Sequence, residues 1–286
     1  MIPAFTRHRA ASSGFVLDLL SVSAAAAYGL RRLRSGYTGP AINVRRSSDN
    51  TTQDIGFTSG ALLDTTALLA FVGSGNGYIA IWYDQGPNAA HASQSTAGSQ
   101  PMIVSAGAVV LQNSVPTLKF YNGGISVLKA TLNAFSAGYA LNAVVANTGS
   151  QAYAAIADKT TTGGVAAPWM FFGQSGAWDR WYIGNGSSQN NTAFSVTDTA
   201  LSIITHECLQ STLAASLFNN GSQIISQTYY AYADSTNQIT IGARGDNATW
   251  LDGPLPELTL FSAPLTTTDR HTLERNQGTY FGVSVA

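Results

Sequence analysis

The sequence predicts an all-β protein, an antiparallel β-sandwich or jelly roll with one helix near its carboxyl end. From Pro116 onward, strand-sized runs such as YALNAVVA and QITIGA recur between turn clusters, with almost no helical pattern between them. The chain has 28 glycines and is rich in Ser, Thr and Asn, a composition typical of β-proteins with many turns. Its 286 residues suffice for one large core, and we find no internal repeat or long linker. We therefore expect one sandwich.

An attachment arm, residues 1–38, is expected ahead of the sandwich domain, residues 39–286. Residues 15–34 read as a helix, or as a helix followed by a strand, because Ala24–Ala27 favours helix. Three arginines near the carboxyl end of this segment suit a helix dipole, and they could bind a partner chain or simply be solvated. These are Arg31, Arg32 and Arg34.

Residues 15–27 also have features of a secretory signal, since they follow two arginines, are mostly apolar and end in small residues. Asp18 interrupts the apolar core, however, and the apolar spacing suits a helix packed on a partner. Both interpretations stay open from the sequence. No stretch approaches the roughly 20 apolar residues that span a bilayer, so no membrane span is expected.

The segment Tyr78–Asp84 is the expected centre of the sandwich. Its run of β-branched and aromatic residues predicts a strand covered on both faces, with Trp82 in the core. Turn-forming residues follow it, and among them Asp84 and Asn88 are expected chiefly to hold the loop.

Two short segments predict helices. Residues 62–72 form an apolar helical pattern, and the glycine-rich residues 73–77 predict a turn, because no Gly-Lys-Ser/Thr follows as in a phosphate loop. After the last strand, Thr266 with Asp269 three residues on forms a capping-box-like helix start.

Charge and cysteine content exclude several classes of function. Charged residues are 10% of the chain and the net charge is −1, so neither a nucleic-acid partner nor a polybasic membrane surface is expected. The single cysteine, Cys208, excludes an internal disulfide framework and favours folding in a reducing cytoplasm. The four histidines are scattered and His206-Glu207-Cys208 lacks metal-ligand spacing, so no metal or cofactor is expected.

The opening third of the chain carries a family resemblance. The order RRSSDNTTQDIGF, a helix, then IAIWYDQGPNAAHASQ resembles the catalytic domain of fungal family 54 α-L-arabinofuranosidases. This resemblance implies a concanavalin-like β-sandwich, and variants of the same opening occur in bacteriophage tail proteins. The fungal enzymes carry several disulfides, which this chain cannot form.

The resemblance also implies a sugar site built from three motifs. IGARGDN, residues 241–247, resembles the motif of the family's acid/base aspartate, and GQSGAW, residues 173–178, resembles the segment that supplies a pocket tryptophan. SQNN, residues 188–191, resembles the nucleophile motif with glutamine in place of glutamate. The implied ligand-binding residues are Trp178, Gln189, Asn190, Asn191, Asp246, Asn247 and Trp250.

Gln189 at the nucleophile position predicts binding without hydrolysis. An amide has no anionic oxygen to attack an anomeric carbon, although it can still hydrogen-bond a sugar hydroxyl. No catalytic residue is then expected, and Asp246 would be the acid/base only in an active enzyme. Activity would require another carboxylate, Asp179 or Asp198, as nucleophile. A third possibility is a structural sandwich in which Trp178 and its neighbours are buried or lie in a subunit contact.

The hypothesis from the sequence is a bacteriophage tail or baseplate protein that contacts host surface carbohydrate or another virion protein. Its amino-terminal segment would attach it to the other tail proteins, and by analogy we expect a homotrimer. The expected location is the virion after folding in the host cytoplasm, with secretion as the alternative. An active exo-glycosidase is the competing hypothesis.

Overall fold

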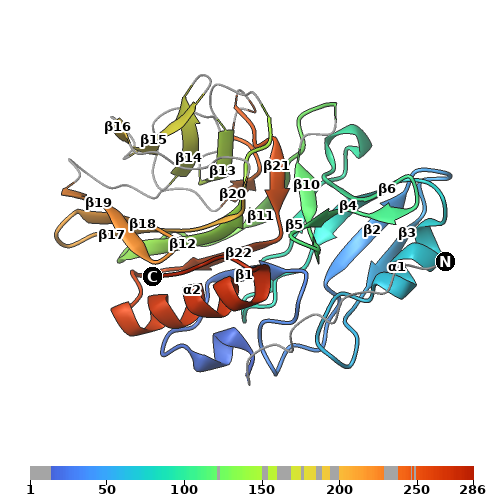
Figure 1. The fold of residues 1–286 in the computed structure, drawn as a ribbon, viewed down its shortest axis with the longest axis horizontal. Helices are drawn as coiled ribbons and strands as arrows, with labels where there is room; N and C mark the ends of the chain where they lie inside the picture. Colours follow the sequence, from blue (N-terminus) through green and yellow to red (C-terminus); the bar gives the residue numbers. More distant parts are fainter. Residues whose placement is uncertain are drawn as a thin grey trace.

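Two antiparallel sheets pack face to face in the computed structural model and form a β-sandwich (Figure 1). This confirms the predicted fold class, including the helix near the carboxyl end. Strands β14 to β16 are described through their backbone. The structure describes residues 14–120, 123–149, 154–159, 169–174, 177–184, 189–193, 200–228, 238–245, 247 and 249–286.

The smaller sheet has six strands in the part of the chain that the structure describes. Strand β22, although late in the chain, lies between β1 and β12. In spatial order the strands are β1 (Ala26–Gly29), β22 (Glu257–Phe261), β12 (Gly138–Val145), β17 (Ser202–Leu209), β18 (Ala214–Asn219) and β19 (Ser222–Thr228).

The larger sheet has fourteen strands among the described residues, and its main path runs from β16 at one edge to β21 at the other. In spatial order this path is β16 (Gln189–Ala193), β15 (Ala177–Gly184), β14 (Trp169–Gln174), β13 (Ala154–Asp158), β20 (Gln238–Ile241), β11 (Leu128–Thr131), β5 (Ala92–Ser93), β4 (Gly77–Trp82), β6 (Met102–Ser105), β10 (Leu118–Phe120) and β21 (Gly253–Leu255). Off the path, β2 (Ile42–Arg46) pairs with β3 (Thr52–Ile55) and β4, and β7 (Ala108–Val109) pairs with β6. A separate hairpin is formed by β8 (Leu111–Gln112) and β9 (Val115–Pro116).

The core lies between the two sheets. Trp82 is fully buried there, as predicted, with its ring 5.5 Å from that of Tyr28. Cys208 is also fully buried. The expectation that β4 is covered on both faces is wrong, because Ala80 and Ile81 are only partly buried. The outer side of this strand borders an open depression instead.

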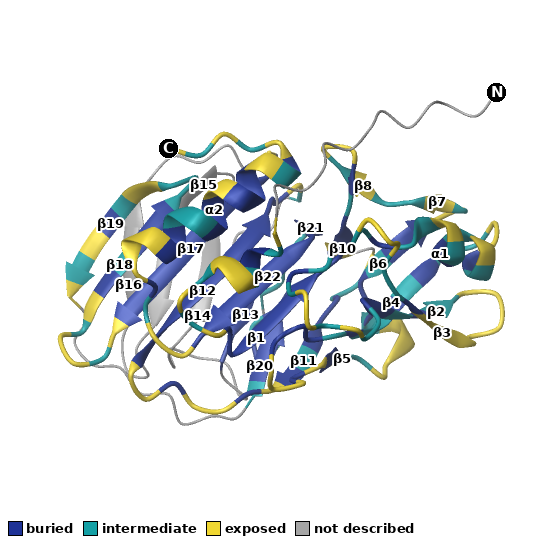
Figure 2. Cartoon of the chain, turned by 90° about the horizontal axis from the view of Figure 1, so that it is seen from below, coloured by how far each residue is buried: buried dark blue, intermediate teal, exposed yellow. Residues whose placement is uncertain are grey.

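Helix α2 (Thr267–Phe281) covers the outer face of the six-stranded sheet (Figure 2). It begins as predicted, since Oγ1 of Thr266 accepts a hydrogen bond from the backbone N–H of Asp269 at 3.0 Å. Leu273 and Phe281 pack on apolar residues of the sheet, and polar side chains join the same contact. Gln277 donates to Asn142 at 2.6 Å and Thr205 donates to Glu274 at 2.6 Å. Buried polar groups need such partners, so the helix and the outer face of the sheet form one hydrogen-bonded layer.

The amino-terminal segment contributes a strand to the sandwich. A 3-10 helix, η1 (Val16–Leu19), precedes strand β1, so a helix followed by a strand is the closer of the two interpretations. The extension of the helix through Ala24–Ala27 is wrong, because β1 starts inside this segment and pairs with β22. Sheet pairing and burial of these small side chains outweigh their helix propensity.

Helix α1 (Thr65–Val72) and the turn after it agree with the prediction. The side chain of Asp64 caps the helix by accepting from the N–H of Ala67 at 2.9 Å. Gly73 ends it with a φ of 67°, a conformation that glycine adopts without strain. Across the residues described, neither helix has the length and apolar character needed to cross a membrane.

Candidate functional site

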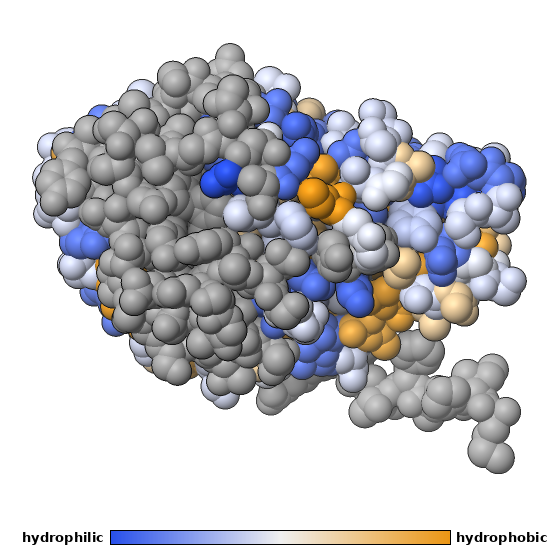
Figure 3. Space-filling view, turned by 90° about the horizontal axis from the view of Figure 1, so that it is seen from above, coloured by the Kyte–Doolittle hydropathy of each residue, from blue (hydrophilic) through white to orange (hydrophobic). Residues whose placement is uncertain are grey.

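A polar depression of about 610 Å³ lies on the outer face of the larger sheet. Strands β4, β5 and β11 contribute to its lining, residues 94–99 border it on one side, and Asn247 belongs to its lining. On this side of the molecule the described surface is mainly hydrophilic, with apolar atoms in small patches (Figure 3). Asn247 is one of the residues that the sequence predicts for the sugar site.

The lining follows from the strand register. Residues directly opposite each other on antiparallel strands project to the same side of the sheet, and their neighbours along each strand project to the other side. Except for Ala80, which also lines the depression, the neighbours here are buried in the core, so one cross-strand row lies on the outer side of the sheet. The outward row is Asn43, Ile81, Ser93, Lys129, Thr240 and Asp158.

A tight loop after β20 carries Asn247. Its first residue, Gly242, has a φ of 83°, and a Cβ at this position would lie 2.0 Å from the ring of Phe120, so only glycine fits. Oδ2 of Asp158 accepts a hydrogen bond from the N–H of Gly245 at 2.8 Å, and Asp158 is 1% exposed. The carboxylate therefore ties the loop to β13.

Residues 94–100 form the opposite side and are also fixed by hydrogen bonds. The side chain of Gln94 donates to the carbonyl of Val127 at 3.1 Å, and that of Gln100 donates to the carbonyl of Gln94 at 2.7 Å. Arg45 in turn donates to Gln100 at 2.7 Å. These contacts position the three hydroxyl-bearing lining residues of this segment. They are Ser95, Thr96 and Ser99.

A hydrogen-bonded group stands at the outer end of the row, on β2 and β3. Asp54 accepts from Asn43 at 2.7 Å and from the hydroxyl of Tyr83 at 2.8 Å. Burial and the contact with Asp54 raise the pKa of Tyr83 to about 12, so its hydroxyl remains a neutral donor at physiological pH. The carboxylate of Asp54 therefore already accepts hydrogen bonds from two neutral donors.

The sequence-predicted site residues fall on two parts of the larger sheet. Asn247 lines the depression, and Trp250 forms a β-bridge with Ala243 in the same loop. Asp246 and Asp198 lie outside the described residues.

The three predicted carboxamide residues, Gln189, Asn190 and Asn191, lie in β16. The predicted pocket tryptophan, Trp178, lies in β15, next to Asp179 in the sequence. The strand register relates these positions to Asp158, which is opposite residue 169 of β14. Two residues further along β14, residue 171 is opposite residue 182 of β15. Residue 182 is in turn opposite residue 191 of β16. By alternation, positions 189 and 191 belong to the side of the sheet that carries Asp158, whereas position 190 belongs to the other. The roles proposed for Gln189, Asn190, Asn191 and Trp178 remain predictions.

Sequence reasoning missed Asp158 and Lys129. Both lie in the outward row, but each is a single charged residue at or near a strand end, where most charged residues are simply solvated. A charged residue that alternates with apolar residues in a strand was the available signal. The register of β11, β20 and β13 is needed to bring them into one row.

The three arginines assigned to partner binding have intramolecular contacts. Arg31 is 6% exposed and pairs with Glu257 through two hydrogen bonds of 2.7 and 3.1 Å. Its charge is neutralised inside the domain, and its assignment to a partner stays a prediction. Arg32 packs 4.3 Å from the ring of Phe15, and Arg34 donates to a backbone carbonyl at 3.4 Å. Both remain partly exposed, and their role stays a prediction.

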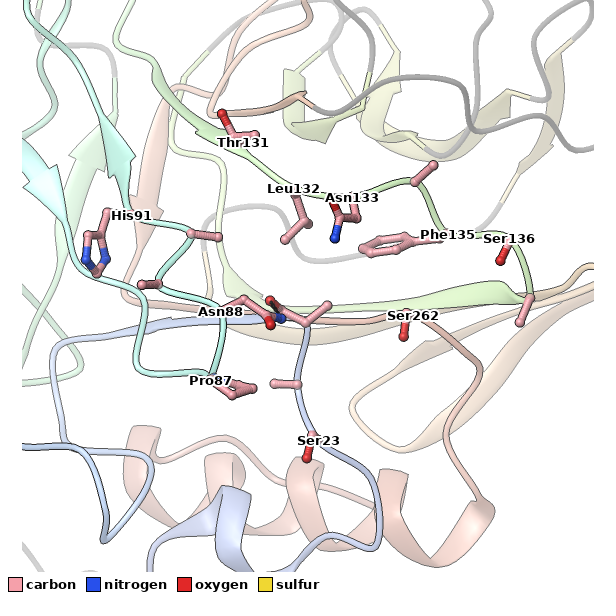
Figure 4. Close-up of a pocket in the computed structure, with 16 residues that line it drawn as sticks. Ser23, Pro87, Asn88, His91, Thr131, Leu132, Asn133, Phe135, Ser136 and Ser262 are labelled. Carbon is pink, nitrogen blue, oxygen red and sulfur yellow. Dashed lines mark hydrogen bonds between the residues drawn. The ribbon is translucent and has the colours of Figure 1, made fainter.

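A second cavity of about 920 Å³ lies where residues 87–91 approach residues 131–137 (Figure 4). Asn88, Asn133 and Phe135 lie around the same central space (Figure 4). Buried Lys159 fixes one side by donating to the carbonyl of Asn133 at 2.7 Å. Of the predicted site residues whose side chains the structure describes, Asn247 and Trp250, neither lines this cavity, and Asn247 lines the depression, so we place the candidate site there.

Asp84 holds the loop beside this second cavity, as predicted. Its carboxylate accepts from the backbone N–H groups of Ala27 and Gly86, both at 2.7 Å, and of Ala90 at 2.9 Å. Asn88 donates to the carbonyl of Ala25 at 2.9 Å. Over the described ranges, no group of three or more His, Cys, Asp or Glu side chains could hold a metal ion.

Comparison with known proteins gives one family. Residues 21–167 match the family described as "Alpha-L-arabinofuranosidase B, catalytic". No curated protein matches the chain in sequence.

Solved structures with the same fold include GH54 α-L-arabinofuranosidases. One, complexed with arabinofuranosyl-α-1,2-xylobiose, has a TM-score of 0.72 and 19% identity over 91% of this chain and 63% of its own. Another, soaked with a cyclic sulfate inhibitor, has a TM-score of 0.70 and 18% identity over the same shares. The binding domain of botulinum neurotoxin serotype D has a TM-score of 0.51 and 11% identity over 92% of this chain and 53% of its own.

These likenesses confirm the concanavalin-like sandwich predicted from the sequence. The chain spans about 63% of the length of the arabinofuranosidases that it matches.

Proposed function

Because this chain belongs to the family of the α-L-arabinofuranosidase B catalytic domain, which matches residues 21–167, we propose that it binds carbohydrate in the depression on its larger sheet. The observation that carries this proposal is Asn247, a residue of the acid/base motif by sequence resemblance, in the lining of that depression. Carboxamide and hydroxyl groups form most of its polar lining, and these groups both donate to and accept from sugar hydroxyls.

The protein is proposed to bind without hydrolysing. Glycosidases of this kind need two carboxyl groups across the scissile bond, and Gln189 occupies the position where the family motif has glutamate. One solved relative is a glutamate-to-glutamine mutant of a GH54 α-L-arabinofuranosidase, soaked with 4-nitrophenyl α-L-arabinofuranoside. That protein combines the same type of replacement with an arabinofuranoside ligand.

Binding and turnover of 4-nitrophenyl α-L-arabinofuranoside test the proposal together. We expect saturable binding by calorimetry, no release of 4-nitrophenol, and weaker binding in Asn247→Ala. Gln189→Glu should restore release of 4-nitrophenol, and Asp246→Asn in that background should abolish it. Release by the unmodified protein, abolished by Asp246→Asn alone, would instead establish an active exo-glycosidase.

The finer proposal is a role in a bacteriophage tail or baseplate, where the sandwich contacts host surface carbohydrate or another virion protein. It is supported by the resemblance of the opening third to tail proteins and by Arg32 and Arg34, which remain partly exposed. We propose a homotrimer located in the virion. Mass spectrometry of purified virions and light scattering of the isolated protein test the location and the stoichiometry. A monomer absent from virions would contradict both.

A further inference from the structure

Lys129 lies at the centre of the outward row on the larger sheet. It is opposite Ser93 of β5 on one side and Thr240 of β20 on the other, and it lines the depression together with Asn247. Lys129 is partly buried, and its place in the lining assigns its charge to the depression.

No described group compensates this charge. Across the ranges that the structure describes, the ammonium group of Lys129 makes neither an ion pair nor a hydrogen bond. Two carboxylates are near this row, and both have other partners. Asp158, within the row, accepts from Gly245. Asp54, at its outer end, accepts from Asn43 and Tyr83.

The three buried cations of the described residues do have partners. Arg31 pairs with Glu257, Arg270 pairs with Glu274, and the ammonium group of Lys159 donates to backbone carbonyls. The remaining side chains that line the depression among the described residues are uncharged. Within the described part of the chain, the depression therefore presents one positive charge surrounded by neutral hydrogen-bonding groups.

We propose that Lys129 selects glycans with an acidic group, a uronate carboxylate or an ester sulfate, for binding in the depression. This inference rests on the proposed carbohydrate-binding function and names the class of glycan. A positive charge in the lining of a depression is less screened by solvent and salt than one on an open surface, so it favours an anion at that position. The surrounding hydroxyl and carboxamide groups hydrogen-bond the sugar ring that carries the anion.

The test compares three probes by calorimetry: tetragalacturonate, a sulfated tetrasaccharide such as a carrageenan fragment, and uncharged arabinofuranosyl-xylobiose. We expect an acidic probe to bind more tightly than the neutral one. Lys129→Met should weaken acidic binding by about fivefold, the upper range for one charge pair near the protein surface, and change neutral binding less than about twofold. Lys129→Arg should retain most of the preference.

Lys119→Met is the matched control, because Lys119 lies exposed on β10 of the same sheet and does not line the depression. It should leave all three affinities unchanged. Raising the salt from about 50 to about 200 mM should weaken acidic binding in the unmodified protein and in this control, but have little effect in Lys129→Met.

The outcomes separate this inference from the proposed function. If the neutral probe binds and no acidic probe binds more tightly, the role of Lys129 is overturned and the proposed function stands. The same holds if an acidic preference exists but Lys129→Met leaves it intact. Failure to bind any of the three probes overturns both. A preference for one acidic probe identifies the group as carboxylate or sulfate.

Discussion

The carboxylate of Asp158 accepts a hydrogen bond from the backbone N–H of Gly245 at 2.8 Å. This contact joins β13 to the loop that carries Asn247, although the two residues are 87 positions apart in the sequence. Because Asp158 is almost fully buried, its carboxylate gains more from this partner than an exposed one would. The geometry of the candidate site therefore depends on a residue outside every motif found in the sequence.

Asp158→Ala should weaken both the fold and the site. A buried N–H left without its acceptor costs about 1–3 kcal/mol, and the loop would lose its attachment to β13. Urea denaturation checks the stability, and titration with the neutral arabinoside checks the site. Asp158→Asn keeps an acceptor oxygen and should lose less of both. Equal losses in the two variants would contradict a role for this hydrogen bond.

Gly242→Ala should destabilise the domain by about 1–3 kcal/mol, through a strained positive φ and a clash with the ring of Phe120. Gly36→Ala is the control, because no atom lies within 4 Å of a Cβ at that position. Thermal unfolding of the two variants should show a clear decrease in Tm only for Gly242→Ala. Similar midpoints would indicate that the loop relaxes without cost.

Arg31→Met should cost about 3–5 kcal/mol, because it leaves the carboxylate of Glu257 buried without its cation. Adding Glu257→Gln to the same chain should recover a large part of that loss. Asp49→Asn, which breaks the exposed pair with Arg46, should change the stability little. Free energies of unfolding from urea curves give the comparison, and full additivity of the first two substitutions would contradict coupling.

The buried carboxyl of Glu207 should make stability depend on pH. Burial raises the pKa of Glu207 to about 7, above its ordinary value of 4.5, so the folded state binds more protons between these values. Its contribution is fully present below about 4.5 and is lost as the pH rises through about 7.

His206 opposes this effect, because burial lowers the pKa of His206 to about 3 and stability falls as the pH drops from about 6.5 towards that value. The measurable quantity is therefore the difference between the unmodified protein and Glu207→Gln. This difference should grow in favour of the variant from about pH 4.5 to above pH 7. A difference that does not change with pH would show that Glu207 titrates normally.

Local patterns predicted the elements whose determinants are close together in the sequence. The cap formed by Thr266 and Asp269, the short helix before Gly73 and the burial of Trp82 all follow from adjacent residues. Ala24–Ala27 was misassigned because its environment is set by β22, more than 230 residues later.

The site was predicted only in part. A motif identified Asn247, whereas the roles of Asp158 and Lys129 depend on the register of strands from distant parts of the chain. A charged residue in a strand does not reveal which loop or cavity it will meet after folding. For this reason the motif residues could be named from the sequence and the residues that support them could not.

The position of β22 has a consequence for how the chain folds during synthesis. Strand β1 emerges from the ribosome early, but its neighbour in the sheet is not made until residue 261, and β12 also waits for the same strand. Until then two strand edges stay open to unwanted pairing, so we expect chaperones to protect the nascent chain. A chain truncated before β22 should aggregate rather than form a smaller folded domain.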